Sequence, residues 1–502
     1  MTRVNGKRAM TAGMTNSRAP GHESLRAAHV VSFADLFASK LAPGLGGVGK
    51  RWLCAVLFPS LLVSAFWAWG QGLSGPYQFD DYVTPLNDPA SQSLAAWQAY
   101  LPVTLRPATK LSYALEAEAG LNSDPAARRI VSIAMLLISA LLLALLAALL
   151  APVTGPSATT TIAAGFVCLL WLVHPVHADA VLLISGRTAL LSGLFLLAAL
   201  LALESRRPWL AGAVFLLACL ARETAVAGLL PLAVLAVSRP AAAWRSAVRE
   251  LLPSLLAAVF ALAWILSTPR YLALAEFSFL GRPFWSSLAA QVGAIPVGLS
   301  LLLQPGGMSI DYGLPLPHHP FEPLAILGAG LYLAAIAGML LAIRHSRVMA
   351  VGLAIWLAAI LPTQSLIPKL DPLSNRPLSL ALAGLLLAAV PLVTWLLRRI
   401  EGSPQKPALA AILICGAALL AVTASMTAQR ARLFSSELLL WQDAASKSLT
   451  NSRPHLQYAK LLLSEGDAEV ARQELATAQR IDPFNSRLAR LVRAYPQIEA
   501  SQ

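Results

Sequence analysis

The sequence is poor in charge. Charged residues make up 13% of the 502 positions, whereas 57% are hydrophobic and the mean hydropathy is +0.64. Soluble domains carry about 25% charged residues, so this composition excludes a soluble globular protein. It indicates an all-α, polytopic membrane protein, because backbone that faces lipid must satisfy its own hydrogen bonds.

The sequence is also poor in cysteine. Its cysteines, Cys54, Cys168, Cys219 and Cys415, all lie within or beside apolar segments. No two of them have the spacing of a metal site or a disulfide framework. We therefore expect small core residues.

The net charge of +13 comes from basic residues that sit in short loops between apolar runs. Basic loops of this kind set membrane topology, so we exclude nucleic acid as a partner. Residues 1–50 are polar and basic and do not resemble a cleavable signal peptide. They are expected to be a cytoplasmic tail, with the first span as a signal anchor.

Residues 51–427 contain about 11 apolar runs that could cross a bilayer, some of them short. They lie at 52–70, 130–151, 159–174, 181–203, 208–220, 225–238, 250–267, 322–343, 348–362, 378–397 and 408–427. With the N-terminus inside, the cytoplasmic loops are basic except for the neutral turn at 152–157. The basic residues are Arg206, Arg207, Arg239, Arg245, Arg249, Arg344, Arg347, Arg398, Arg399 and Lys406. If segment 286–303 crossed the membrane, the later basic loops would lie outside the cytoplasm. We expect it to be a re-entrant or surface-lying helix in an external region, 268–321.

The loops expected outside the cytoplasm hold most of the conspicuous polar side chains. They carry Phe79-Asp80-Asp81-Tyr82 with Asn87, then Arg106, His174, His177, Asp179, Arg187, Arg222, Glu223, Asp311 and Arg376. Charge at bilayer depth is costly and usually marks a functional site. Any chemistry is therefore expected on the extracytoplasmic face.

The composition changes after the last span, and residues 428–502 are expected to form a small extracytoplasmic helical domain. Residues 452–486 fit one tetratricopeptide repeat, with Ala459, Leu462, Ala471, Leu475, Ala478 and Pro483 at its characteristic positions. A generic helical hairpin is the alternative. A single repeat cannot bury its own face, so it should lean on a leading helix at 436–447, on the segment after Asn485 or on the membrane domain.

The order of these motifs resembles the GT-C superfamily of membrane glycosyltransferases. The motifs are Phe79-Asp80-Asp81-Tyr82, Arg106-Pro107, His174-Pro175-Val176-His177-Ala178-Asp179, Ser185-Gly186-Arg187, Arg222-Glu223-Thr224 and the C-terminal repeat. Within that superfamily the chain is similar to the transmembrane and tetratricopeptide-repeat-containing O-mannosyltransferases and their bacterial relatives. The resemblance implies a polyprenyl-phosphate-linked sugar donor, with mannose as one candidate sugar. It also implies an acceptor hydroxyl on a protein.

By that resemblance Asp80 is the base for the acceptor hydroxyl, and Asp81 orients the acceptor or binds a metal. The alternative is that one carboxylate caps the following helix or pairs with Arg106. Asn87, Arg106, Asp179 and Glu223 are expected to position the acceptor or the loops. In-line attack would invert the anomeric carbon.

Arginines are candidates for the donor phosphate, because guanidinium offers a planar fork of donors and keeps its charge. They are Arg187, Arg222 and Arg376. The alternatives are snorkelling at a helix end and, for Arg222, pairing with Glu223. His174 and His177 could contact the phosphate or a carboxylate, ligate a metal, or be inert. No cofactor is certain, and a divalent metal stays open.

Three other functions fit parts of the sequence. The acceptor could be an envelope lipid or glycan instead of a protein. A transporter of the lipid-linked sugar would place charge near the bilayer midplane and often repeats its halves, and neither feature is seen. A scaffold that docks partner proteins through the repeat would tolerate changes at Asp80, Arg187 and Arg222.

Overall fold

The computed structural model describes residues 59–150, 158–239, 244–280, 283–362, 371–401 and 406–494. Within these ranges the chain is helical, with 3-10 and π turns between the α-helices and no strand. The all-α fold class is therefore confirmed. The predicted cytoplasmic tail lies outside the described residues.

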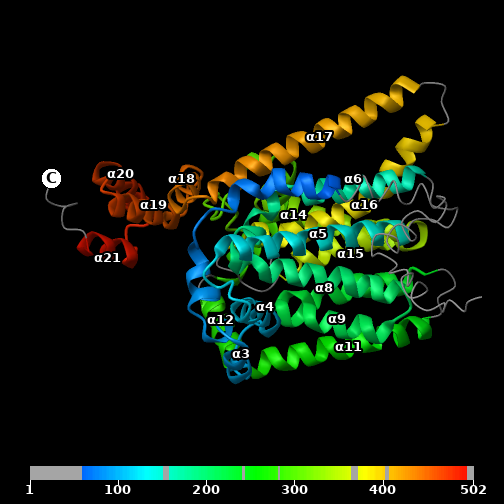
Figure 1. The fold of residues 1–502 in the computed structure, drawn as a ribbon, viewed down its shortest axis with the longest axis horizontal. Coiled ribbons are helices and arrows are strands. Elements are labelled where there is room, and N and C mark those ends of the chain that lie inside the picture. Colours follow the sequence, from blue (N-terminus) through cyan, green and yellow to red (C-terminus); the bar gives the residue numbers. More distant parts are fainter. Residues whose placement is uncertain are drawn as a thin grey trace, which may run out of the picture.

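Long and shorter apolar helices run side by side and form one bundle (Figure 1). They are α5 (Pro125–Leu150), α6 (Ala158–Leu172), α8 (Arg187–Glu204), α9 (Pro208–Ala221), α10 (Leu229–Val237), α11 (Trp244–Ser267), α14 (Pro323–His345), α15 (Arg347–Ile360), α16 (Asn375–Glu401) and α17 (Lys406–Leu433). Seven helices in the described residues are long and apolar enough to cross a membrane, or eight if one bent pair counts as a span. The chain is thus a multi-pass membrane protein by helix length and composition.

The prediction of 11 spans is confirmed only in part. Spanning-length helices cover the runs predicted at 130–151, 181–203, 250–267, 322–343, 378–397 and 408–427. The run at 159–174 is one arm of a pair bent by 47°. Those at 208–220, 225–238 and 348–362 are shorter helices; α9, with 14 residues, is only about 21 Å long. The first run is helical over 59–69, where the description begins.

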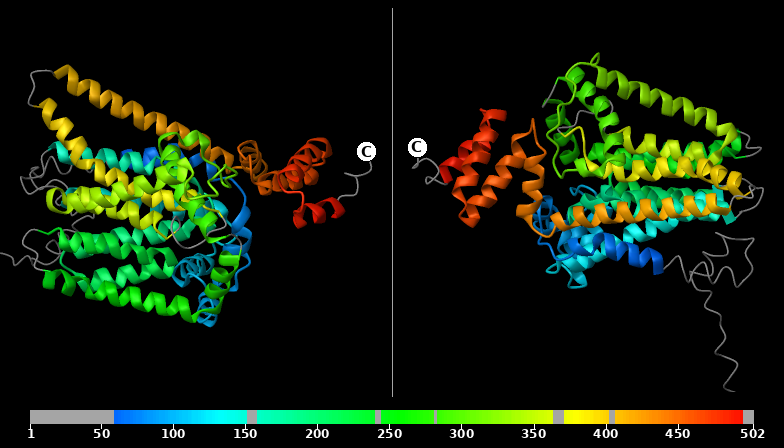
Figure 2. Two further views of the ribbon diagram at one scale, coloured as in Figure 1. Left: turned by 180° about the vertical axis from the view of Figure 1, so that it is seen from behind. Right: turned by 90° about the horizontal axis from the view of Figure 1, so that it is seen from above.

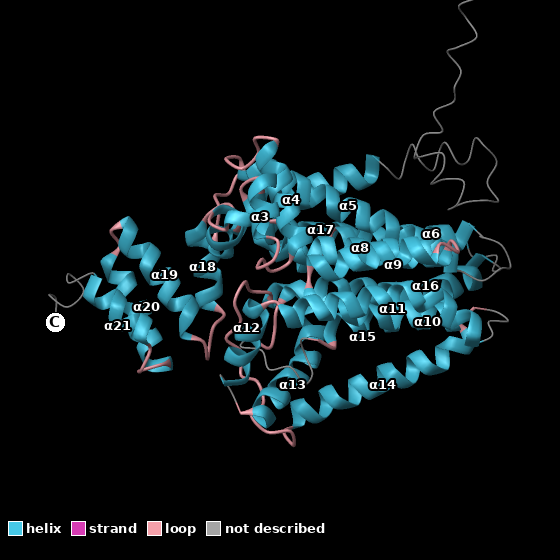
Figure 3. Cartoon of the chain, turned by 90° about the horizontal axis from the view of Figure 1, so that it is seen from below, coloured by secondary structure: helices cyan, strands magenta, loops and turns pink. Residues whose placement is uncertain are grey.

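The segment predicted not to cross forms α13 (Phe284–Leu303), which is itself long and apolar enough to span. Its middle residue Gly293 faces Pro317, just before α14 begins. Near its end, the Leu302 carbonyl meets the His174 ring at 3.0 Å. These contacts place α13 beside the start of α14, as Figure 3 shows. Because α13 is one of the seven candidate spans, the prediction that this segment does not cross is not confirmed.

At the end of the bundle where α14 begins, the described chain forms many short elements between the long helices, and we call it the loop-rich end. Its short elements are η2 (Phe79–Asp81), α3 (Leu94–Tyr100), α4 (Pro107–Glu118), η5 (Pro175–His177), α7 (Ala178–Val181), η6 (Ile184–Gly186), η7 (Glu223–Gly228), α12 (Pro269–Leu280) and η8 (Pro305–Gly307). At the opposite end, Arg239 and Arg347 both pair with Glu204. The predicted basic loops around 206, 239 and 347 therefore meet at one end of the bundle.

Two helices of the bundle approach so closely that only glycine fits between them. A Cβ at Gly352 of α15 would lie 2.6 Å from the carbonyl of Gly384, and one at Gly384 of α16 would lie 2.5 Å from the Trp356 nitrogen. Small residues at such crossings are typical of helix packing in membranes. The contact fixes α16, whose first turn carries Arg376.

The C-terminal helices project beyond the loop-rich end (Figures 1 and 2). They are α18 (Glu437–Ser446), α19 (Ser452–Glu465), α20 (Ala468–Ile481) and α21 (Ser486–Ala494). Gly466 joins α19 to α20 with φ of 91°, a conformation that favours glycine. The five apolar positions predicted for the repeat, from Ala459 to Ala478, are all buried. The helical hairpin is confirmed, whereas its identity as a tetratricopeptide repeat stays a prediction.

The hairpin packs against all three supports considered for it: α18, α21 and the membrane domain. The Gly313 carbonyl accepts hydrogen bonds from the Leu449 and Thr450 N–H groups at 2.8 and 3.1 Å. A Cβ at Gly313 would collide with the Ser448 hydroxyl, so this contact depends on glycine. Arg453 adds a bidentate ion pair with Asp311.

The cysteines match their predicted role in part. Cys168 and Cys219 are buried and free, but Cys415 is exposed on the outer face of α17. Cys54 lies outside the described residues.

Candidate functional site

The acidic doublet lies in a strained turn at the loop-rich end. Phe79 precedes Asp80 with φ of 50°, which costs a non-glycine residue about 1–3 kcal/mol. The Phe79 ring packs edge-on against Trp441 of α18, with centroids 5.3 Å apart. The C-terminal domain therefore helps to hold the turn that carries Asp80.

The two carboxylates of the doublet point to different places. Asp80 lines a cavity of about 300 Å³, and its side chain is 42% exposed. Asp81 is fully buried and accepts hydrogen bonds from the N–H groups of Ser185 and Gln78 at 2.8 and 3.4 Å. Burial raises the pKa of Asp81, although these hydrogen bonds oppose the shift. Asp81 thus ties the turn to η6, and Asp80 alone of the pair faces the cavity.

Arg376 and Asp80 meet inside this cavity. The Arg376 guanidinium donates to Asp80 Oδ2 at 3.1 Å. Arg376 follows Asn375 in the first turn of α16, and Asn375 Nδ2 donates to Asp179 at 2.9 Å. Asp179 also lines the cavity and lies 3.6 Å from Arg430. The carboxylate of Asp179 therefore anchors the start of α16 and positions Arg376.

Arg106 and Glu223 form a second ion pair at the same cavity. The Arg106 guanidinium holds both Glu223 oxygens, at 2.8 and 2.6 Å. Burial alone would raise the pKa of Glu223, but the charge and hydrogen bonds of Arg106 outweigh it and lower the pKa to about 2. Neither aspartate of the doublet pairs with Arg106.

Among the described residues, Arg222 is the one arginine of the cavity without a carboxylate partner. The partner considered for it, Glu223, is occupied by Arg106, and the Arg222 side chain has no hydrogen bond or ion pair among the described residues. Burial and the neighbouring charge of Arg106 lower the pKa of Arg222 to about 10, so it stays charged at neutral pH. An unpaired guanidinium is poised to bind an anion.

A narrow slot of about 30 Å³ continues from the two arginines into the bundle. Arg222 and Arg376 line both the cavity and this slot. Its remaining walls come from α8, η7, α15 and α16 and are mostly small or apolar: Ala189, Ser192, Leu196, Thr224, Ala225, Gly228, Ala358, Ala359, Pro377 and Leu380. The slot has room for about one water molecule, so it joins an apolar surface to the two arginines without holding a tail of its own.

The two histidines do not reach the cavity. His174 is buried, with one ring nitrogen at the Leu302 carbonyl and the other accepting from the Val176 N–H at 3.1 Å. His177 is fully buried between the Ser379 hydroxyl and the Trp171 carbonyl, at 2.8 and 2.6 Å. All four ring nitrogens are thus used within the protein, which favours the inert alternative.

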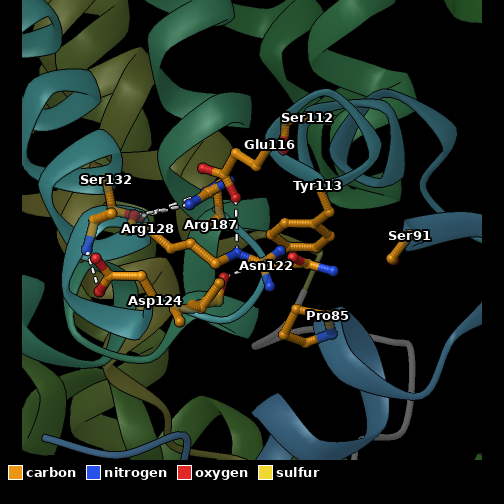
Figure 4. Close-up of polar contacts among 12 residues, drawn as sticks. Pro85, Ser91, Ser112, Tyr113, Glu116, Asn122, Asp124, Arg128, Ser132 and Arg187 are labelled. Carbon is orange, nitrogen blue, oxygen red and sulfur yellow. Dashed lines mark hydrogen bonds and ion pairs between the residues drawn. The ribbon is translucent and has the colours of Figure 1, made fainter. Parts of the chain in front are cut away.

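Arg187 belongs to a separate buried cluster. Its guanidinium pairs with Glu116 at 2.6 Å, and the other oxygen of Glu116 pairs with Arg128 at 2.8 Å. Figure 4 shows Glu116 beside both arginines, with the Tyr113 ring next to them. Arg187 is completely buried. The expected role of Arg187 in phosphate binding therefore has no support from its position.

The remaining predicted residue, Asn87, is exposed at the end of η3 (Tyr82–Leu86) and does not line the cavity. Other residues of the site were not assigned a role from the sequence. Asp311, Tyr312, Asp371 and Arg453 all line the cavity. Arg453 donates to Asp311 at 2.5 and 2.6 Å and to Asp371 at 3.0 Å.

No group of three or more His, Cys, Asp or Glu side chains gathers as a metal site among the residues that the structure describes. Comparisons with protein-family models, curated proteins and solved structures found no match. The GT-C resemblance therefore stays a prediction, and the function has to be argued from the cavity.

Proposed function

We propose that the chain is an integral membrane glycosyltransferase that moves a sugar from a polyprenyl-phosphate-linked donor to an acceptor hydroxyl on the extracytoplasmic face. One observation carries the proposal. A half-exposed carboxylate, Asp80, shares a cavity with two arginines, Arg222 and Arg376, and those arginines also line an apolar slot into the bundle.

The donor fits this arrangement by its chemistry. A polyprenyl phosphate sugar has one anionic phosphodiester between a polar sugar and a hydrocarbon tail. In the proposal the phosphate binds Arg222 and Arg376 and the sugar lies in the cavity beside Asp80. The tail leaves on the apolar side of the two arginines, where the slot would have to widen to admit it, because it now has room for about one water molecule. Charge-assisted hydrogen bonds to a desolvated phosphate are the strong kind.

The transfer needs few protein groups, because phosphate is already a good leaving group. Asp80 accepts the proton of the acceptor hydroxyl as its oxygen attacks the anomeric carbon. The bond from that carbon to the phosphate oxygen breaks, and its electron pair leaves with the phosphate, which the two arginines stabilise. Attack opposite the leaving group inverts the anomeric centre. The product is a glycosylated acceptor and a polyprenyl phosphate.

The ion pair between Asp80 and Arg376 links the proposed base to one of the proposed phosphate-binding arginines. Without donor, Arg376 neutralises the base. A bound phosphate competes for Arg376 and frees Asp80 to accept a proton. The geometry therefore favours donor binding before activation of the acceptor.

Replacing Asp80 with Asn tests the proposal. The purified full chain in lipid nanodiscs would be given a radiolabelled polyprenyl phosphate sugar, with polyprenyl phosphate mannose first, and a mixture of peptide and glycan acceptors. Loss of a positioned base should lower transfer about 10²–10⁴-fold. Asp124→Asn is the matched control, since Asp124 is exposed at the same end and only caps α5. Full transfer by Asp80→Asn would overturn the assignment of the base.

A further inference from the structure

Three exposed arginines gather at the end of the bundle opposite the loop-rich end. They are Arg207, just before α9, and Arg245 and Arg249 in the first two turns of α11. We call them the arginine surface. Among the described residues, none of the three side chains has an ion pair or hydrogen bond, whereas the neighbouring Arg206 is paired. Their charge is therefore available to an anion outside the protein.

Two carboxylates near the arginine surface are already neutralised by other arginines. Glu250 of α11 pairs with Arg206 at 2.6 Å and also with Arg239. Glu204 pairs with Arg347 at 2.7 Å and lies 3.5 Å from Arg239. These three arginines leave neither glutamate free to balance the arginine surface, so its positive charge is uncompensated.

Arg207 and Arg249 lie at one level of the bundle, on helices that Figure 1 shows side by side at its edge. The helices approach closely, because a Cβ at Gly212 of α9 would lie 2.7 Å from Pro253 of α11. Arg207 comes five residues before that contact and Arg249 four, which is about 7.5 and 6 Å along the helix axes. The ion pair between their chain neighbours joins the two helices there. Both guanidinium groups can thus reach the same headgroup.

Exposed aliphatic side chains continue from the arginines along both helices. On α11, Leu252 and Leu256 are exposed and follow Arg249 by three and seven residues, so all three share one face. On α9, Leu210 and Leu217 are exposed as well. Cations followed by an aliphatic face match a molecule with an anionic head and hydrocarbon chains.

Two tryptophans place the arginine surface at the membrane boundary. Trp209 in the first turn of α9 is 70% exposed, and Trp244 at the start of α11 is 72% exposed. Exposed tryptophan is enriched at the headgroup level of a bilayer, where its ring is apolar and its N–H is polar. The neighbouring arginines are therefore at the depth of lipid phosphates.

We infer that the arginine surface binds a phospholipid with an anionic headgroup, in the leaflet on the side away from Asp80. The lipid phosphate lies between Arg207 and Arg249, Arg245 contacts the outer part of the headgroup, and the acyl chains lie along α9 and α11. Basic residues near a membrane surface attract anionic lipids. The site is at the opposite end from the proposed sugar transfer and does not depend on it.

Native mass spectrometry of the full chain in detergent tests this inference. The lipids are phosphatidylglycerol and phosphatidylcholine with the same acyl chains, at equal concentration. Replacing Arg207 and Arg249 together with Gln should weaken phosphatidylglycerol binding about 10–100-fold and leave phosphatidylcholine binding unchanged. The matched control replaces Arg344 and Arg399 with Gln, which removes the same charge from exposed positions at the same end, on α14 and α16.

Equal losses in the two double variants would overturn the inference, because they would show a general effect of positive charge and no site. So would displacement of phosphatidylglycerol by an equal concentration of soluble glycerol phosphate, which would show that the acyl chains contribute nothing. Phosphatidylglycerol should also raise the melting temperature of the unaltered chain and of the control, but not that of the Arg207 and Arg249 variant. If that variant does not fold, Arg245→Gln alone provides the test, with an expected loss of about fivefold.

Discussion

Two arginines at the ends of apolar runs lie in opposite environments. Arg187 begins an apolar run and Arg222 ends one, and both were candidates for a phosphate. Arg187 is completely buried against Glu116, whereas Arg222 faces a cavity with no partner among the described residues. Replacing each arginine should therefore affect a different quantity: donor binding for Arg222 and the stability of the fold for Arg187.

Arg222→Gln should weaken donor binding about 10–100-fold, the loss of one charge-assisted hydrogen bond to phosphate, with little change in thermal unfolding. Arg187→Gln should instead destabilise the protein by about 3–5 kcal/mol, because it leaves part of the Glu116 charge buried and uncompensated. Donor binding to nanodiscs and thermal unfolding in detergent measure the two effects. Equal losses of binding without loss of stability would put both arginines in the site.

The pair between Arg106 and Glu223 makes stability depend on pH. The pKa of Glu223 falls from an ordinary 4.5 to about 2 in the folded state, since Arg106 outweighs the effect of burial. A lowered carboxyl pKa stabilises the fold above pH 4.5, and this contribution is lost as the pH falls toward 2. Glu223→Gln should lower the melting temperature at neutral pH, and the gap to the unaltered chain should narrow below about pH 4.5. A gap that is constant with pH would contradict this account.

The sequence predicted which residues lie in loops better than which way they point. Asp80 of η2, Arg222 at the end of α9 and Arg376 in the first turn of α16 share one cavity. His174 and His177 also lie in a loop at that end, but their rings turn inward to backbone carbonyls. The pair of Asp311 and Arg453 was missed because it joins residues 142 positions apart. Periodicity and hydropathy contain no signal for such a contact.

At the scale of helices, hydropathy located the apolar runs, but short ones were counted as spans. The run predicted to span at 348–362 forms α15, which has only 14 residues. A helix enclosed by other helices need not match the bilayer thickness, because neighbouring protein replaces lipid at its ends. α15 is buried along almost its whole length, which is why composition alone counted it as a span.

The contact between α15 and α16 should affect the position of Arg376 in the cavity, because Arg376 lies at the start of α16. Gly384→Val would drive a side chain into the Trp356 backbone, so α15 and α16 would separate and move Arg376 at the start of α16. We expect a lower melting temperature and weaker donor binding together. Gly330→Val is the control, since Gly330 on α14 has nothing within 4 Å of its Cβ position. If the two variants melt and bind alike, the close helix contact does not position Arg376.

At the scale of the whole molecule, the proposed function depends on which side of the membrane the loop-rich end faces. Arg206, Arg239 and Glu250 gather at the opposite end, where basic loops predict the cytoplasm. In a chain without its native cysteines, a membrane-impermeant maleimide should label Phe484→Cys on intact cells. It should label Arg206→Cys only after permeabilisation, although both side chains are well exposed. The reverse pattern would put Asp80 in the cytoplasm, where it could not serve a donor and an acceptor presented outside.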